Sequence, residues 1–200
     1  MYAHESLPNV VLLLILRHAK TERSNPGGDH ARRLVDRGQR DAARMGEYLL
    51  AQNLAPTAAW VSDATRTRET FEIVARELAQ PVRIQFERSL YLAAPDTLMD
   101  IISQTHDEVE TLLLVGHNPG MHELAYALGA NSADENAGNV HMDALARKFP
   151  TCSLAVIEFD MPSWRDIGHG ASHLQRYVTA KSLRRPSDED SLRWSESDAD

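Results

Sequence analysis

The sequence predicts an α/β fold, a three-layer α/β/α sandwich around a mostly parallel central sheet. Two apolar runs, at residues 10–16 and 111–116, carry no charge and are typical of strands buried on both faces. Segments with helical spacing alternate with strand-like segments through most of the chain, which is the pattern of α/β proteins. A chain of 200 residues, 42% hydrophobic and 25% charged, fits one globular domain.

The first half of the chain supplies two strands and two helices. The first strand is followed by residues 21–34, where Pro, Gly, Asn and Asp predict a loop. Over 36–52 apolar residues recur at helical spacing between charged ones, so an amphipathic helix is expected. A short apolar run at 58–62 predicts the next strand. A helix over 64–79 should follow it and end before Pro81.

The middle of the chain continues the alternation. Residues 82–86 alternate between apolar and polar positions, as in a half-exposed strand. A helix is expected over 94–106, with Asp96 or Thr97 near its N-cap. After the strand at 111–116, a further helix is expected that opens with proline and closes with glycine.

The last part of the chain should hold two more strands, at 152–159 and 173–179. Residues 130–147 are rich in Ala, Asn, Asp and Gly, which is typical of a flexible segment. Residues 181–200 are polar and acidic and have too little apolar surface to pack. We therefore expect a single domain over 1–180, followed by a disordered acidic tail.

Charge and cysteine content limit the partners and the compartment. The formal net charge of −8 argues against a nucleic-acid partner, because phosphate backbones bind basic surfaces. The single cysteine, Cys152, excludes an intrachain disulfide and is expected to be a buried small hydrophobe. The apolar run at 10–16 is too short to span a membrane and lacks the basic flank of a signal peptide. A cytoplasmic protein without a membrane partner is predicted.

Reactive side chains follow three of the predicted strands. Arg17 and His18 follow the first strand, Arg66 lies in the first turn of the helix after the second, and His117 follows the strand at 111–116. In open α/β sheets, ligands bind at the carboxyl ends of the strands. We therefore expect these four side chains to converge on one pocket.

Two histidines among arginines suit phosphoryl chemistry. Arginine presents a planar fork of donors that matches phosphate oxygens. A histidine beside it can attack phosphorus and carry the phosphoryl group, while the positive charge keeps that histidine neutral and stabilises the transferring oxygens. No metal or other cofactor is expected. His122 begins a stretch that resembles a zinc helix, but Tyr126 stands where the second histidine would be needed.

Three stretches in order, "LRHAKT", "SDATRTRET" and "LLLVGHNPG", resemble the histidine phosphatase superfamily. The stretches "RRLVDRGQRDA" and "VGHNPGMHELA" are similar to the SixA-type phosphohistidine phosphatases within it. The resemblance runs from about Val10 to Phe159 and implies a phosphoglycerate mutase-like fold. It also implies roles by position: His18 as the phosphorylated nucleophile, Arg17 and Arg66 as phosphate clamps, and His117 as a hydrogen-bond donor to the phosphoryl group.

The sequence also departs from the family pattern. Ala19 stands where many members have glycine, and Ser24 where larger members often have asparagine. Glu87 is only a candidate for the proton donor that many members use, with a solvated strand-end charge as the equal alternative. Lys20 and Arg33 are expected to widen the positive rim of the pocket.

The resemblance implies a metal-independent phosphatase that releases inorganic phosphate. Short connections between elements leave little chain for a lid, and an open site suits phosphohistidine in a protein, such as a histidine phosphotransfer protein. Three alternatives stay open at this point: a phosphatase of small phosphorylated molecules, a mutase on the same residues, and a non-catalytic phosphate-recognition module.

Overall fold

The computed structural model describes residues 10–131, 140–169 and 171–184. Within them the strands form one sheet of order β3-β2-β4-β1-β5-β6. The strands are β1 (Val10–Arg17), β2 (Ala58–Ser62), β3 (Arg83–Glu87), β4 (Thr111–Gly116), β5 (Leu154–Asp160) and β6 (Ser172–Val178). Each lies within a residue or two of the segment that the sequence predicts.

Strand direction in the sheet is mostly parallel, as predicted. β1 pairs with β4, and β2 pairs with both β3 and β4, all in parallel. β5 runs antiparallel to its neighbours β1 and β6, so it is the one reversed strand of the described sheet. β1 and β4 are therefore central, and their carboxyl ends lie side by side, with Arg17 opposite Gly116.

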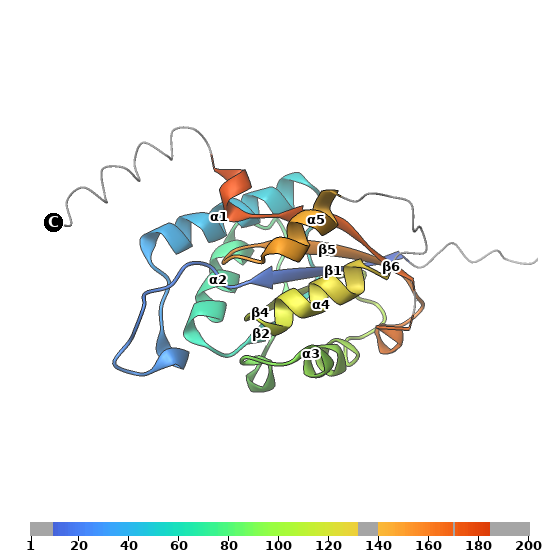
Figure 1. The fold of residues 1–200 in the computed structure, drawn as a ribbon, viewed down its shortest axis with the longest axis horizontal. Helices are drawn as coiled ribbons and strands as arrows, with labels where there is room; N and C mark the ends of the chain where they lie inside the picture. Colours follow the sequence, from blue (N-terminus) through green and yellow to red (C-terminus); the bar gives the residue numbers. More distant parts are fainter. Residues whose placement is uncertain (1–9, 132–139, 170, 185–200) are drawn as a thin grey trace, which may run out of the picture.

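Helices cover both faces of the sheet (Figure 1). They are α1 (Asp36–Ala51), α2 (Thr65–Arg76), α3 (Pro95–Ile102), α4 (Gly120–Gly129) and α5 (Val140–Arg147), with 3-10 turns η1 (Asp29–Ala31), η2 (Arg88–Leu90), η3 (Trp164–Asp166) and η4 (Ala180–Leu183). α1 and α2 pack on one face, and α3, α4 and α5 on the other. This is the predicted three-layer sandwich.

Among the residues that the structure describes, none of the helices combines the length and the apolar character that a membrane-spanning helix needs.

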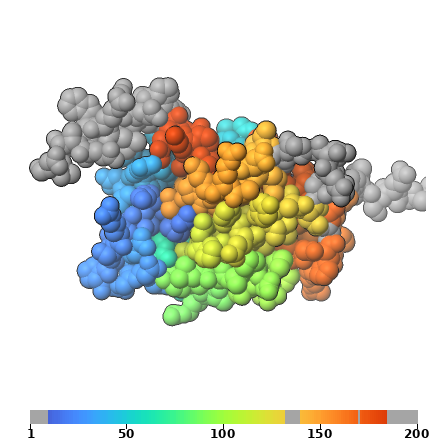
Figure 2. All heavy atoms as spheres, in the orientation of Figure 1, coloured from blue at the N-terminus to red at the C-terminus, as the bar shows by residue number. Residues whose placement is uncertain are grey.

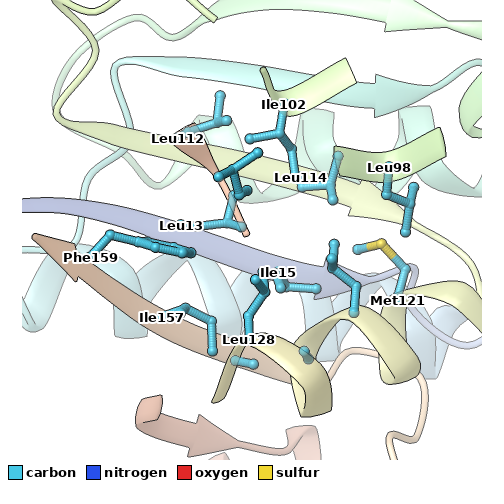
Figure 3. Packing of buried hydrophobic residues seen from close by; sticks show 14 of the residues in the cluster. Leu13, Ile15, Leu98, Ile102, Leu112, Leu114, Met121, Leu128, Ile157 and Phe159 are labelled. Atoms are coloured by element: carbon cyan, nitrogen blue, oxygen red, sulfur yellow. The ribbon is translucent and has the colours of Figure 1, made fainter. Parts of the chain in front are cut away.

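The two faces of β1 show why the sequence folds this way. Leu13 and Ile15 are fully buried and belong to the same core cluster as Leu98 of α3, as Figure 3 shows. Leu14, one position along, is also fully buried but joins Met45 of α1 in the opposite layer. Because successive side chains of a strand alternate between faces, an uninterrupted apolar run fills both layers at once.

Two segments expected to be unpacked are partly folded. α5 lies inside the 130–147 segment, where Leu145 is fully buried; residues 132–139 lie outside the described residues. The predicted tail begins with η4, whose N-cap Thr179 forms a capping box with Ser182, and Arg184 then contacts Asp41 at 3.1 Å. These short segments pack through one or two side chains, which composition does not reveal. The rest of the predicted tail, 185–200, lies outside the described residues.

The start of α3 also differs from the prediction. Its N-cap is Ala94, and Pro95 is the first helical residue, so Asp96 and Thr97 lie inside the first turn. The fixed backbone of proline suits the first helical position, where no N–H is needed. The helix ends at Ile102, earlier than the predicted residue 106.

Candidate active site

The four predicted site residues line one cavity of about 430 Å³ at the carboxyl ends of β1 and β4. The rings of His18 and His117 have their centroids 5.3 Å apart. Besides Arg17, His18, Arg66 and His117, the lining residues are Lys20, Thr21, Arg23, Asp29, Arg32, Leu92, Asn118 and Thr151. Figure 2 shows that the blue segment after β1, which supplies several of these residues, lies at one end of the molecule.

Backbone hydrogen bonds fix His18 where β1 ends. Its own N–H donates to the carbonyl of Gly116 at 3.1 Å, and its carbonyl accepts from the N–H of Cys152 at 3.0 Å. The next residue, Ala19, donates its N–H to the hydroxyl of Thr70 at 3.0 Å. The turn is thus tied to β4, to the residues before β5 and to α2, and His18 has little freedom to move.

The tautomer of His18 follows from its contact with the backbone. Its Nδ1 lies 2.8 Å from the carbonyl oxygen of Ala19. A carbonyl can only accept a hydrogen bond, so Nδ1 carries the proton. In the neutral ring Nε2 then holds a free electron pair, and this nitrogen is the nucleophilic atom of the pair.

Burial keeps the His18 ring neutral. It lowers the pKa of His18 from 6.5 to about 3; the hydrogen bond to Ala19 opposes the shift, and the charge of Arg66 adds to it. A buried imidazole beside guanidinium groups gains too little solvation to hold a proton. The His18 ring is therefore neutral throughout the neutral pH range, with its proton on Nδ1 and a free electron pair on Nε2.

His117 presents a complementary group. Burial, together with the charge of Arg66, lowers its pKa to about 2, so this ring is also neutral. Its Nε2 lies 2.8 Å from the hydroxyl of Ser62, while its buried Nδ1 has no hydrogen-bond partner among the described residues. When Ser62 donates to Nε2, Nδ1 carries the proton and can donate it to an oxygen in the cavity.

Arg17 and Arg66 are positioned by hydrogen bonds, but some of their N–H donors have no partner among the described residues. Arg17 donates from Nη1 to the carbonyl of Phe149 at 2.8 Å. Arg66, only 2% exposed, donates from Nη1 to the carbonyl of Asp29 at 2.6 Å and from Nη2 to its carboxylate at 3.0 Å. The Nε atoms of both arginines are buried and lack a partner among the described residues. Oriented guanidinium groups with free donors are suited to bind an anion.

Asp29 is the one acidic residue among those lining the cavity. Its carboxylate accepts from the hydroxyl of Tyr91 at 2.6 Å and from Arg32 at 2.8 Å, besides Arg66. These donors, Tyr91 foremost, hold the pKa of Asp29 far below its usual range, so it stays ionised. Sequence reasoning missed Asp29, Arg32 and Tyr91, although all three lie in the segments that follow β1 and β3, and ligands of α/β sheets bind at the carboxyl ends of strands.

The remaining expectations divide. Lys20 lines the cavity as expected. Arg33 does not; it pairs with Glu69 at 2.8 Å. Glu87 is also outside the cavity and accepts from the N–H and the hydroxyl of Ser89, which lowers its pKa. Glu87 is therefore an ionised side chain at the end of β3. This agrees with the alternative given above, a strand-end charge, and not with a proton donor in the cavity.

Cys152 is not among the residues that line the cavity. Cys152 is fully buried, and burial raises the pKa of its thiol, as expected for a small hydrophobe. In the parts of the chain that the structure describes, no three His, Cys, Asp or Glu side chains are grouped so as to hold a metal ion.

Comparison with known proteins gives related sequences and structures. A family model described as the histidine phosphatase superfamily (branch 1) matches residues 13–90. An uncharacterised protein of Mycobacterium tuberculosis is 35% identical over 159 residues, covering 80% of this chain and 96% of that protein. The structure of a proposed phosphohistidine phosphatase SixA from Nakamurella multipartitia has a TM-score of 0.74 and 25% identity, covering 84% of this chain and 95% of the other. A phosphoglycerate mutase from Plasmodium falciparum shares the fold, with a TM-score of 0.52 and 14% identity over 84% and 89% of the two chains.

Proposed function

Because the chain belongs to the histidine phosphatase superfamily and is of the SixA type, we propose that it removes the phosphoryl group from phosphohistidine in a protein, through a covalent intermediate on His18. The observation that carries the proposal is the bare Nε2 of His18 in a cavity that Arg17, Arg66 and His117 also line. Histidine phosphotransfer proteins are the proposed partners, and the cytoplasm is the proposed location.

The first step transfers the phosphoryl group to the enzyme. The electron pair of His18 Nε2 attacks phosphorus, and a new N–P bond forms as the P–N bond to the substrate imidazole breaks. The leaving imidazole nitrogen takes a proton from solvent. Arg17 and Arg66 hold the phosphoryl oxygens, and Nδ1–H of His117 donates to one of them, where negative charge is concentrated.

The second step returns the enzyme to its starting state. Water attacks phosphorus from the open side of the cavity, the bond to His18 Nε2 breaks, and inorganic phosphate leaves with the proton balance restored by solvent. Because Nδ1 of His18 stays bonded to the carbonyl of Ala19, the ring keeps its orientation through both steps. The arginines supply the positive charge that a metal ion provides in other phosphatases.

The acidity of the lining groups favours a phosphoramidate over a phosphate ester. An alkoxide leaving group needs a proton from a neutral acid, whereas an imidazole is a good leaving group once it is protonated by solvent. Asp29, the one carboxyl group among the described lining residues, is ionised and so has no proton to give. This supports phosphohistidine as the substrate and slow turnover of phosphomonoesters.

The test is hydrolysis of a phosphohistidine-bearing phosphotransfer protein, with p-nitrophenyl phosphate and a sugar phosphate in parallel and EDTA throughout. The expected result is fast loss of phosphohistidine that resists EDTA and falls at least about 1000-fold in His18→Ala. His106→Ala, which removes an exposed histidine elsewhere, should keep full activity.

Other outcomes would replace the proposal. Fast hydrolysis of the esters with inert phosphohistidine would identify a small-molecule phosphatase, and transfer of label to an acceptor without phosphate release would identify a mutase. Phosphate binding without turnover of any substrate would identify a recognition module.

A further inference from the structure

All lysines of the chain line one cavity. The sequence contains three, Lys20, Lys148 and Lys181, whereas the other basic residues are arginines. Together they line a second cavity of about 260 Å³. They come from three distant parts of the chain: the segment after β1, the segment after α5, and η4. We call this cavity the lysine cavity.

The lysine cavity carries an excess of available positive charge. Two arginines also line it, but Arg37 and Arg184 pair with the buried carboxylate of Asp41 at 3.8 and 3.1 Å. The three lysines are exposed, and within the described residues no carboxylate lies within ion-pair distance of their ammonium groups. Their charge is therefore free to attract an external anion, in a chain whose formal net charge is −8.

The lysine cavity adjoins the candidate active site. Lys20 and Thr151 line both cavities. A ligand that places its phosphoryl group next to His18 can thus extend over Thr151 into the lysine cavity. An anionic group that binds in the lysine cavity would then belong to the same substrate molecule as the phosphoryl group and lie a short distance from it.

We propose that the lysine cavity binds acidic side chains that flank the phosphohistidine of the protein substrate. The inference rests on the proposed function and assigns a specificity site to it. Lysine ammonium groups are point charges on flexible stems, well suited to carboxylates whose position varies between substrates. The planar fork of arginine would favour bidentate binding of a phosphate, but the two arginines of this cavity are already paired with Asp41.

Exposed charges of this kind affect the rate at which enzyme and substrate associate more than the rate of the chemical step. They raise the association rate of an oppositely charged partner, and salt screens the effect over about 8 to 10 Å. The lysine cavity should therefore raise kcat/KM for acidic substrates at low ionic strength and leave kcat unchanged.

The test compares two phosphohistidine peptides that are identical except for their flanks, Asp and Glu in one and Asn and Gln in the other. The enzymes are wild type, Lys148→Gln/Lys181→Gln, and the matched control Arg76→Gln/Arg165→Gln, which removes two exposed charges on other parts of the surface. Wild type and control should prefer the acidic peptide about tenfold in kcat/KM at low salt. The lysine variant should lose most of that preference and hydrolyse the neutral peptide at the wild-type rate.

The outcomes separate this inference from the proposed function. Hydrolysis of both peptides by the wild type at equal rates would overturn the acidic site and leave the phosphatase function standing. Equal loss of both activities in the lysine variant would also overturn it, because the cavity would then serve the reacting phosphoryl group. If the wild type hydrolyses neither peptide but does hydrolyse p-nitrophenyl phosphate, the phosphohistidine substrate and this site both fail.

Discussion

Asp29 holds Arg66 at two points, through its backbone carbonyl and through its carboxylate. The carbonyl contact orients the guanidinium without adding charge. The carboxylate contact places a negative charge in the same cavity that is to receive a phosphoryl group. Asp29 therefore positions the guanidinium of Arg66 and also weakens the attraction of that guanidinium for anions. A substitution at Asp29 that keeps the hydrogen bonds and removes the charge separates the two effects.

Asp29→Asn should tighten the binding of inorganic phosphate. The amide oxygen can still accept from Arg66, but the negative charge is lost. Two charges 4 Å apart interact by about 1 kcal/mol in bulk water, so the inhibition constant of phosphate should fall about fivefold. Competitive inhibition against p-nitrophenyl phosphate measures it, with the exposed Asp107→Asn as the control. A weaker phosphate complex would show that the carboxylate serves mainly to position Arg66.

The pH profile of kcat/KM should carry no histidine ionisation between pH 5 and 8. The pKa values of His18 and His117, about 3 and about 2, leave both rings neutral over this range, so lowering the pH does not protonate the nucleophile. A break in the profile should therefore follow the ionisation of the substrate and move when p-nitrophenyl phosphate is exchanged for a phosphoramidate. A break near pH 6.5 common to both substrates would contradict this.

The same lowered pKa values should make the fold less stable in acid. Below pH 6.5 the unfolded chain binds protons at His18 and His117 that the folded chain does not, so the free energy of unfolding falls as the pH falls toward 3. Each histidine contributes up to about 1.4 kcal/mol per pH unit. In urea denaturation, the free energy of unfolding should fall less between pH 7 and pH 5.5 in His117→Asn than in wild type. The fall in His106→Asn, at an exposed histidine, should match that of wild type.

Thr70 should matter for both stability and catalysis. Its hydroxyl accepts the N–H of Ala19, immediately after the nucleophile, and donates to the carbonyl of Arg66. Thr70→Val keeps the shape and removes the acceptor, and an unsatisfied buried N–H costs about 1–3 kcal/mol. The Tm of thermal unfolding and kcat should both be lower in Thr70→Val than in wild type. Thr70→Ser keeps the hydroxyl and should have the wild-type kcat. Unchanged kcat in the valine variant would mean that the backbone contacts alone fix His18.

The four central site residues could be located from sequence because the carboxyl ends of parallel strands lie at the same edge of the sheet. Arg17 ends β1 and His18 follows it, and His117 directly follows β4, the neighbour of β1 in the sheet. Arg66 lies in the first turn of the helix after β2. Their convergence depends only on strand order and direction. A short unbroken apolar run, rich in branched residues and flanked by turn residues, indicates such a central strand.

The residues that sequence reasoning missed depend on how loops run. Asp29 and Tyr91 are 62 positions apart, and their contact requires the loop after β1 to fold toward the link between β3 and α3. The grouping of the lysines likewise depends on where η4 and the segment after α5 return to the surface. No spacing rule describes such paths, because loops lack the periodicity that helices and strands impose on a sequence.

The burial of Cys152 has a consequence for oxidative stress. Phosphatases that attack phosphorus with a thiolate are switched off when an oxidant converts that sulfur to a sulfenic acid. Here the single sulfhydryl of the chain is fully buried, and its raised pKa disfavours the thiolate that peroxide attacks. Nitrogen carries the phosphoryl group in the proposed mechanism instead. Dephosphorylation by this protein should therefore continue at peroxide concentrations that silence cysteine-dependent phosphatases.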